Sequence, residues 1–589
     1  MNDLKSRWFD SIDKSCPLSE YPRPQLARKS WLCLNGEYDY SITGADAECP
    51  KVYDGKILVP FSVESAASGV QKPLLPTQRL WYRRKFTLTD EFNDKRTILH
   101  FDAVDWQCTV WVNGTLMGEH TGGYNPFSFD ITDVLKDGEN ELVVRVYDPT
   151  SDGHQQRGKQ ILKTQGFWYT ATSGIWQTVW LEPVNPCRIE SIKLVPDIDE
   201  GVIGLKVNTT TCGCEGKLFA KVLDGDNVVF DGEISADAKI PVPDAKLWSP
   251  ENPFLYDLEL TFDCNGKKDE VKSYFGMRKY SIMKDDKGIP RLALNNKPYF
   301  QRGLLDQGYW PESQLTPPTD EAMIFDIEEM KNLGFNMLRK HIKTEPLRWY
   351  YHCDRLGMLV WQDMISGGQY IGQLLAGGLP LFSIHVKDNK ENMYKAFKRD
   401  EPEWREEFRQ ELRGMIDNLY NCTSICCWVP FNEGWGQFDA KEIGLKVKEL
   451  DPTRFVDHAS GWHDQNGPDF KSVHRYIAPV TPPFSFTRKG RPFVLSEYGG
   501  YSWNIANHVW NAKKSFGYVM FTSSDALSKA YKFLHKTQII PLIKCGLSAT
   551  VYTQVSDVEF EVNGIYSYDR KVLKINKETL LEINNQLKY

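Results

Sequence analysis

Two glutamates each follow an apolar stretch of chain directly. The stretch 428-WVPFNEGWG-436 runs into Asn432 and Glu433, and the stretch 493-FVLSEYGG-500 runs into Glu497 in the same way. Two carboxyl groups can act together on a glycosidic bond, where one protonates the leaving oxygen and the other acts as a nucleophile or as a base on water. This chemistry uses neither a metal nor a cofactor, and we expect none.

The segments that must position these acids alternate between strands and helices. A helix-like stretch such as 320-DEAMIFDIEEMKNLG-334 starts at an aspartate, carries an apolar stripe and ends at a glycine. Eight strands alternating with helices predict a (β/α)₈ barrel, in which catalytic groups lie at the carboxyl ends of the strands. Glu433 and Glu497 are therefore predicted to meet at one rim. The predicted strands are 299–305, 335–341, 358–363, 425–431, 454–460, 472–477, 493–498 and 548–554.

The part of the chain before the barrel has a β pattern. Short aromatic and β-branched segments such as 79-RLWYRRKFTL-88 are separated by turn residues, and Asn113-Gly114 indicates a hairpin. The next hundred or so residues stay β but become smaller and more polar, as in an immunoglobulin-like sandwich. We predict three domains: a β-sandwich over 1–185, an immunoglobulin-like β-sandwich over 186–283 and the barrel over 284–589.

Charge and composition exclude several classes of partner. A formal net charge of −7 argues against nucleic acid, which calls for a basic surface. No segment has the apolar length of a signal peptide core or a membrane span, so we expect no membrane association. Most cysteines lie in apolar runs such as 425-ICCW-428, which favours a cytoplasmic location. Cys212 and Cys214 lack a second ligand pair, so we predict no metal site there.

Over nearly its whole length the chain resembles glycoside hydrolase family 2, the β-galactosidase and β-glucuronidase family. The resemblance implies that the first domain is a jelly-roll sugar-binding domain. It rests on the following stretches, which occur in the family's order: 101-FDAVDWQCTVWVNGTLMGEHTGGYNPFSFDIT-132, 174-GIWQTVWLEPV-184, 294-LNNKPYFQRG-303, 330-MKNLGFNMLRKH-341, 353-CDRLGMLVWQD-363, 421-NCTSICCWVPFNEGWG-436 and 492-PFVLSEYGG-500.

The resemblance also implies roles for the residues at the predicted rim. Glu433 would be the general acid/base, Glu497 the nucleophile of a retaining mechanism with a covalent glycosyl-enzyme, and Asn432 a contact of the substrate 2-hydroxyl. The implied activity is that of an exo-acting β-glycosidase, for which we expect a β-galactosidase. A homo-oligomer is expected by analogy with the family. A non-catalytic carbohydrate-binding protein is the alternative from another class.

The nearest alternative enzyme is a β-glucuronidase. Glucuronidases of this family carry an Asn-x-Lys element after the eighth strand, but this chain reads 562-VNGIYSYDRK-571 there, without a lysine after Asn563-Gly564. The Asn-x-Lys at 511–513 lies elsewhere, which weighs against a glucuronide. The family pattern also changes at three strand ends, in 302-RGLLDQGYWPES-313, 339-RKHIKTEP-346 and 551-VYTQVSD-557, so the sugar stays open.

Other residues near the strand ends are candidates for substrate contacts, each with a structural alternative. Arg339 could support the active site or simply pack, and Asp363 could bind a hydroxyl or cap the next helix. The histidines at these ends could bind substrate or satisfy local hydrogen bonds, and aromatic side chains could stack on a sugar or fill the core. Tyr498 could also donate to a carboxylate. The further candidates are His341, His474, Trp435, Trp462, His463, Trp503 and Tyr552.

The segment 364–403 is long for a βα loop of a barrel. Long loops on the catalytic face tend to form lids or binding walls. We predict that this segment covers part of the pocket.

Overall fold

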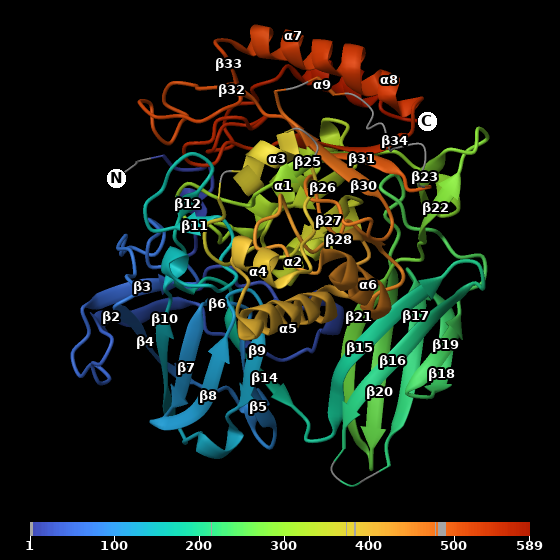
Figure 1. The fold of residues 1–589 in the computed structure, drawn as a ribbon. Coiled ribbons are helices and arrows are strands. Elements are labelled where there is room, and N and C mark those ends of the chain that lie inside the picture. Colours follow the sequence, from blue (N-terminus) through green and yellow to red (C-terminus); the bar gives the residue numbers. More distant parts are fainter. Residues whose placement is uncertain are drawn as a thin grey trace.

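The computed structural model describes residues 4–211, 213, 215–372, 374–381, 384–477, 479–480 and 490–589. It confirms the predicted architecture of two β-sandwiches and a (β/α)₈ barrel. In Figure 1 the barrel lies at the centre, the first sandwich at the lower left and the second at the lower right. Cys212 and Cys214, for which a metal role was not expected, lie outside the described residues.

The first sandwich consists of two antiparallel sheets with a shared apolar core. The strand orders are β3-β2-β4-β10-β7-β8 and β1-β14-β5-β9. Inward-facing side chains such as Tyr82, Val110 and Leu181 are fully buried between the sheets. The strands are β1 (Leu32–Cys33), β2 (Gly36–Gly44), β3 (Gly55–Val59), β4 (Gln78–Thr87), β5 (Arg96–Phe101), β7 (Gln107–Val112), β8 (Thr115–Thr121), β9 (Phe127–Asp130), β10 (Glu139–Tyr147) and β14 (Val179–Val184).

The second sandwich has a three-stranded and a four-stranded sheet, in the orders β15-β16-β19 and β18-β17-β20-β21. Its alternating burial, for example along Tyr256–Cys264, is typical of strands with one face on a core and one in water. The strands are β15 (Arg188–Asp197), β16 (Val202–Thr210), β17 (Lys217–Asp224), β18 (Asn227–Ile234), β19 (Asp237–Pro241), β20 (Tyr256–Cys264) and β21 (Lys267–Phe275).

The barrel is one sheet of eight parallel strands in the order β29-β28-β27-β26-β25-β34-β31-β30. Each of the eight predicted strand segments overlaps one of them, with observed bounds that extend at most one residue beyond the predicted ones. Most are buried on both faces, which explains why they read as continuous apolar runs. The strands are β25 (Gln301–Asp306), β26 (Met337–Lys340), β27 (Leu359–Asp363), β28 (Ile425–Val429), β29 (Phe455–Val456), β30 (Lys471–Arg475), β31 (Phe493–Gly499) and β34 (Leu547–Thr553).

Helices surround the barrel strands. The predicted helix after the first strand is α1, whose N-cap Thr319 accepts a hydrogen bond from the Ala322 amide. None of the helices within the described residues is long and apolar enough to cross a membrane. The α-helices are α1 (Asp320–Asn332), α2 (Leu347–Leu356), α3 (Leu379–Leu381), α4 (Glu391–Ala396), α5 (Pro402–Leu419), α6 (Ala440–Leu450), α7 (Ser524–Leu534), α8 (Ile540–Ile543) and α9 (Lys577–Asn584).

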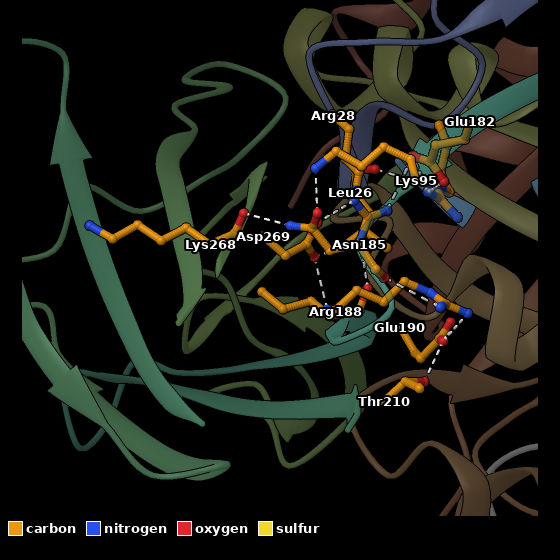
Figure 2. Close-up of polar contacts among 12 residues, drawn as sticks. Leu26, Arg28, Lys95, Glu182, Asn185, Arg188, Glu190, Thr210, Lys268 and Asp269 are labelled. Carbon is orange, nitrogen blue, oxygen red and sulfur yellow. Dashed lines mark hydrogen bonds and ion pairs between the residues drawn. The ribbon is translucent and has the colours of Figure 1, made fainter. Parts of the chain in front are cut away.

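A buried ion network joins the two sandwiches (Figure 2). We call Arg23, Arg28, Glu182 and Asp269 the interdomain ion network. Arg28 donates to Glu182 on β14 at 3.1 Å and to Asp269 on β21 at 2.9–3.0 Å. Arg23 donates to both oxygens of Glu182 at 2.9 Å. The network therefore fixes how one sandwich meets the other.

The first sandwich also packs against the barrel through apolar side chains. Tyr124, Tyr169 and Trp176 belong to the same hydrophobic cluster as the residues that fill the space around the barrel strands. A segment near residue 156 pairs with Gly367, at the start of the long loop after β27. The sandwich is therefore placed against the carboxyl face of the barrel.

Candidate active site

The backbone beyond β28 presents Glu433 at the carboxyl rim. Asn432 pairs with Ser460, which follows β29, and the Glu433 amide donates to the Ser460 carbonyl at 3.0 Å. Glu433 has a φ of +52°, and Gly434 follows with +72°. A non-glycine residue in this left-handed region costs roughly 1–2 kcal/mol. Two successive left-handed residues turn the chain away and leave the Glu433 carboxyl group at the cavity.

Glu497 lies near the end of β31, where buried donors hold it. Arg339, at the end of β26, donates from Nη1 to Glu497 Oε1 at 3.1 Å. The Tyr476 hydroxyl donates to Glu497 Oε2. Arg339 also donates from Nε and Nη2 to the two Asp363 oxygens at 2.9 and 3.0 Å. We call Arg339, Asp363 and Glu497 the active-site ion network.

The two predicted acids come together as the sequence indicated. His474 lies between them, with Nδ1 at 2.8 Å from Glu433 Oε1 and 3.6 Å from Glu497 Oε2. One oxygen of each carboxyl group and a ring nitrogen of His474 all lie within 4.8 Å of one another. Both acids line the same cavity, so a single atom of a bound molecule can contact both.

The surroundings of Glu497 keep it ionised. Burial alone would raise its pKa, but the positive charges of His474 and Arg339 and the hydrogen bond from Tyr476 lower the pKa to about 2. The guanidinium of Arg339 is permanently charged, so this anion persists at neutral pH. Glu433 is the more accessible acid, with 26% of its side chain exposed against 5% for Glu497.

The hydrogen bonds of Asn432 and His341 determine which of their polar atoms can donate or accept at the cavity. Arg339 Nη2 donates to Asn432 Oδ1 at 2.8 Å, so the Asn432 amide nitrogen is left to donate to a ligand. His341 Nδ1 lies 2.8 Å from Asp363 Oδ2, and burial lowers the pKa of this histidine well below its usual value. The neutral ring donates from Nδ1 to Asp363, which leaves Nε2 as an acceptor.

Asp363 has neither of the two roles predicted for it, which were to bind a substrate hydroxyl or to cap the next helix. Its side chain is fully buried and accepts hydrogen bonds from Arg339 and His341. It neither caps a helix nor reaches the cavity, and the structure corrects that expectation. Asp363 instead orients two side chains that contact the acids and the cavity.

The cavity above the acids has a volume of about 420 Å³. This value lies within the range of about 300–1,000 Å³ found for small-molecule sites. Trp435 and Trp462 line it, as predicted from sequence. The wall also includes Leu305, Ile342 and a strip of the first sandwich, and its full set is Lys159, Gln165, Gly166, Phe167, Trp168, Leu305, His341, Ile342, Tyr370, Ile371, Ala376, Asn432, Glu433, Trp435, Trp462, Tyr476, Glu497, Tyr518, Thr553 and Glu561.

The long loop 364–403 covers part of the cavity, as predicted. Tyr370, Ile371 and Ala376 line the cavity wall. His463 supports this loop and is not itself part of the wall: its Nε2 lies 3.0 Å from the Leu375 carbonyl oxygen. This corrects the expectation for His463, whereas Trp462 beside it does line the cavity.

Three predicted aromatic contacts lie in the core and not at the cavity. The Tyr498 hydroxyl lies 2.8 Å from His535 Nε2, and the Tyr552 ring packs against the Tyr498 ring. Trp503 packs at the edge of the hydrophobic cluster around the barrel. Neighbouring residues of a strand point to opposite faces, so Tyr498 must point away when Glu497 points inward. The expectation that these three side chains contact a sugar is corrected.

Sequence reasoning missed several residues of the wall. Tyr476 gives Glu497 the hydrogen bond expected of Tyr498, and its ring stacks on Tyr518 at 3.9 Å. Strand alternation provides a signal for Tyr476, because it lies two residues after His474 and just past the end of β30, where continued alternation would place it on the same face. Lys159 and Glu561 come from distant segments, and we find no local pattern that marks them.

The strand ends that depart from the family pattern contain a buried charge cluster. Lys340 Nζ donates to Asp306 at 2.6 Å and to Glu345 at 2.8 Å, and Lys343 donates to Glu345 at 2.7 Å. The side chains of Asp306, Lys340, Lys343 and Glu345 are at most 3% exposed, so they lie beneath the surface of the rim and support its loops. Leu305, His341, Ile342 and Thr553 from these three stretches line the cavity wall, whereas the charged side chains stabilise the loops behind it.

A histidine with two carboxylates is also a set that could hold a metal ion. The group of Glu433, His474 and Glu497 is close enough for this. However, one Glu497 oxygen already accepts from Arg339 and the other from Tyr476. The donors around Glu497 fit an isolated anion better than a metal ligand, because a second cation would be added beside the Arg339 guanidinium.

Comparisons with known proteins agree with this arrangement. Three family models match in order: "Glycosyl hydrolases family 2, sugar binding domain" over 34–184, "Glycosyl hydrolases family 2" over 187–278 and "Glycosyl hydrolases family 2, TIM barrel domain" over 291–578. A β-galactosidase of Thermoanaerobacter pseudethanolicus is 29% identical over 395 residues, which is 64% of this chain and 47% of that relative. The chain thus spans about half the length of this curated relative.

Solved structures share the fold over almost the whole chain. A β-D-glucuronidase of Dictyoglomus thermophilum has a TM-score of 0.75 at 16% identity and covers 96% of this chain and 98% of its own. A β-galacturonidase of Eisenbergiella tayi has a TM-score of 0.68 at 18% identity, with coverage of 96% and 98%. At these identities the likeness speaks for the fold alone.

Proposed function

Because the chain belongs to glycosyl hydrolase family 2, we propose that it is a retaining exo-β-glycosidase that uses Glu497 as nucleophile and Glu433 as general acid/base. The observation that supports this most directly is the pair of carboxyl groups in one cavity, with oxygens within 4.8 Å of each other. Retaining enzymes separate their carboxyl groups by about 5–5.5 Å, and inverting enzymes by about 6.5–9.5 Å.

In the first step, a Glu497 oxygen attacks the anomeric carbon as the bond to the leaving oxygen breaks. Glu433 gives its proton to that oxygen, so the aglycone leaves as a neutral alcohol. Arg339 and Tyr476 keep Glu497 anionic and aimed at the cavity. The amide nitrogen of Asn432 is free to donate to the 2-hydroxyl of the sugar.

In the second step, Glu433 accepts a proton from water while the water oxygen attacks the anomeric carbon. The ester bond to Glu497 breaks, the free sugar leaves with its β configuration kept, and Glu497 returns to its anionic form. His474, at 2.8 Å from Glu433 Oε1, holds the acid/base in position during both steps.

For the sugar we propose a β-galactoside, which the named β-galactosidase relative supports. A β-glucuronide is the second candidate, and one observation favours it. The ammonium group of Lys159 lies at the cavity, where it could bind the carboxylate of a uronic acid.

The test is hydrolysis of nitrophenyl β-glycosides by the wild type, Glu433→Gln and Glu497→Gln. Glu559→Gln serves as the control, because Glu559 is buried in the same barrel and bonds the Thr170 amide instead of facing the cavity. We expect Glu497→Gln to lose turnover on every substrate. Glu433→Gln should still release a dinitrophenolate, which needs no protonation, but not a poor leaving group.

Two further measurements separate the mechanism from its alternatives. A 2-fluoroglycoside should form a covalent adduct at Glu497, and the first sugar product seen by NMR should be the β anomer. An α anomer as first product would replace the retaining mechanism by an inverting one. Turnover that both glutamine variants leave unchanged would overturn the assignment of the acids, and wild-type binding without turnover would identify a carbohydrate-binding protein.

A further inference from the structure

A third carboxylate, that of Glu561, faces the cavity. It lies in the segment after β34 and is only 3% exposed, yet it lines the same wall as the two proposed catalytic acids. Burial is the largest cause that raises the pKa of Tyr518, and the negative charges of Glu433, Glu561 and Glu497 come next. Glu433, Glu497, Tyr518 and Glu561 all line this one cavity, so Glu561 faces the same space as the two proposed catalytic acids.

Two buried donors fix the Glu561 carboxylate in one orientation. The Tyr169 hydroxyl donates to Oε2, and the Asn563 amide nitrogen donates to Oε1 at 2.9 Å. The amide of Gln554 in turn donates to Asn563 Oδ1 at 2.7 Å, so the Asn563 nitrogen must face Glu561. A carboxylate has about four acceptor positions, and these two bonds fill only two of them. The remaining capacity is available to hydroxyl groups in the cavity.

A cationic donor lies next to the same tyrosine. The Lys159 Nζ is 5.6 Å from the centroid of the Tyr169 ring and 5.7 Å from that of Phe167. Its charge also contributes to the lowered pKa of His341, on the barrel side of the cavity. Lys159 can therefore donate to one hydroxyl while Glu561 accepts from a neighbouring one. A vicinal diol offers both partners at once.

We propose that Glu561 selects a neutral sugar with adjacent hydroxyl groups, one of which Lys159 contacts, and that the negative charge of Glu561 disfavours a uronic acid at this site. The proposal rests on the glycosidase function proposed above and narrows its substrate class. A uronate would bring another negative charge into a cavity that already faces Glu497 and Glu561. Like charges in a partly buried site repel strongly, whereas a hydroxyl can donate to the carboxylate at no such cost.

The experiment compares two substrate pairs that differ only at C6: nitrophenyl β-galactoside with β-galacturonide, and nitrophenyl β-glucoside with β-glucuronide. The wild type should prefer the neutral member of a pair. Glu561→Gln keeps the shape and removes the charge, so kcat/KM for the neutral sugar should fall by about 10- to 100-fold. The ratio of uronide to neutral kcat/KM should rise by a similar factor.

Three further variants complete the test. Tyr169→Phe keeps the charge and removes one hydrogen bond, so it should lower kcat/KM less and leave the charge preference unchanged. Lys159→Met should weaken the binding of neutral substrates and therefore raise their KM. Glu559→Gln should match the wild type. Thermal unfolding of each variant identifies a loss that is due to misfolding.

Failure of the inference differs from failure of the proposed function. A wild type that prefers the uronide, with the preference abolished in Lys159→Met, would overturn the inference while glycoside hydrolysis stands. Equal losses on both members of each pair in Glu561→Gln would also overturn it, because they would indicate a structural role only. A wild type that hydrolyses none of the four glycosides would overturn both.

Discussion

The interdomain and active-site ion networks are built from the same parts. Each has an arginine whose guanidinium contacts two carboxylates, Arg28 in the first and Arg339 in the second. The central glutamates, Glu182 and Glu497, have side chains that are 2% and 5% exposed. In both, burial raises the pKa but the nearby positive charges outweigh it, so the pKa of each glutamate is lowered.

The networks differ in what surrounds the glutamate. Glu182 lies on β14, inside the sheet that β14 forms with β5. Its carboxylate oxygens accept hydrogen bonds from Arg23, Arg28 and Tyr21. Glu497 lies near a strand end, lines a cavity and has a second acid within 4.8 Å. Burial, ion pairing and a lowered pKa therefore do not distinguish a structural acid from a reactive one. Access to a cavity and a second acid do.

Replacing the central glutamate of each network should separate the two roles. Glu497→Gln should lower kcat by about 10⁴-fold or more, because it removes the proposed nucleophile. Its free energy of unfolding should change little by comparison, since Arg339 keeps both bonds to Asp363. Steady-state kinetics with a nitrophenyl glycoside and urea unfolding measure the two effects. A variant that unfolds readily but keeps its turnover would reverse the comparison.

Glu182→Gln should show the opposite pattern. It leaves Arg23, whose side chain is 24% exposed, without its carboxylate partner and leaves the buried Arg28 with Asp269 alone, so we expect a loss of about 3–5 kcal/mol in the free energy of unfolding. Turnover of the folded fraction should stay close to that of the wild type. Glu37→Gln is the matched control: it breaks an exposed pair with Lys56, both about 60% exposed, for which about 0–1 kcal/mol is expected.

The effect of Glu182→Gln should also depend on pH. The pKa of Glu182 is lowered in the folded state, so its contribution to stability is complete above the unfolded value of about 4.3. The contribution is lost as the pH falls through the folded value. The difference in unfolding free energy between wild type and variant should therefore be largest near neutral pH and shrink in acid. A difference that grows in acid would contradict this assignment.

Arg339→Lys should have an intermediate effect on the active-site network. Lysine keeps the charge but cannot bond Asp363, Glu497 and Asn432 together, so we expect kcat/KM to fall by about 100-fold. Weaker stabilisation of the anion should raise the pKa of Glu497 from about 2. The acid side of the pH–rate profile should then move to higher pH. A uniform loss without this movement would indicate that Arg339 only packs.

Tyr370→Ala should have the smallest effect. Tyr370 is 56% exposed and lines the mouth of the cavity, so we expect KM to change by less than about tenfold and stability to stay unchanged. Deleting the whole loop 364–403 would be a poorer test of its role. Asp388 and Arg399 within it are 2% and 1% exposed, and their loss would disturb the fold itself.

Much of the site could be predicted because the local pattern of apolar and polar residues indicates where each barrel strand ends. An apolar run that meets Asn432-Glu433 or Glu497 marks the carboxyl rim of a barrel, and the eight strands place both acids there. The error at Tyr498 was avoidable, because it is adjacent to Glu497 on a strand and must face the other way. The correct donor, Tyr476, follows from the same rule.

The remaining wall could not be predicted because it depends on contacts between distant segments. Lys159 and Tyr169 belong to the first sandwich, and Glu561 lies in the last part of the chain. No periodicity or spacing relates them, since only the packing of two domains brings them together. The charge cluster of Lys340, Lys343 and Glu345 is a similar case: its residues read as a binding loop but satisfy one another.

The hydrogen bond from Tyr169 to Glu561 has a consequence for recombination between homologous enzymes. A chimaera that combined this barrel with the sandwich of another enzyme would keep both proposed catalytic acids, because these come from the barrel alone. It would exchange one side of the cavity at the same time. Crossovers at the domain boundary should therefore yield hydrolases whose selectivity follows the donor of the amino-terminal module.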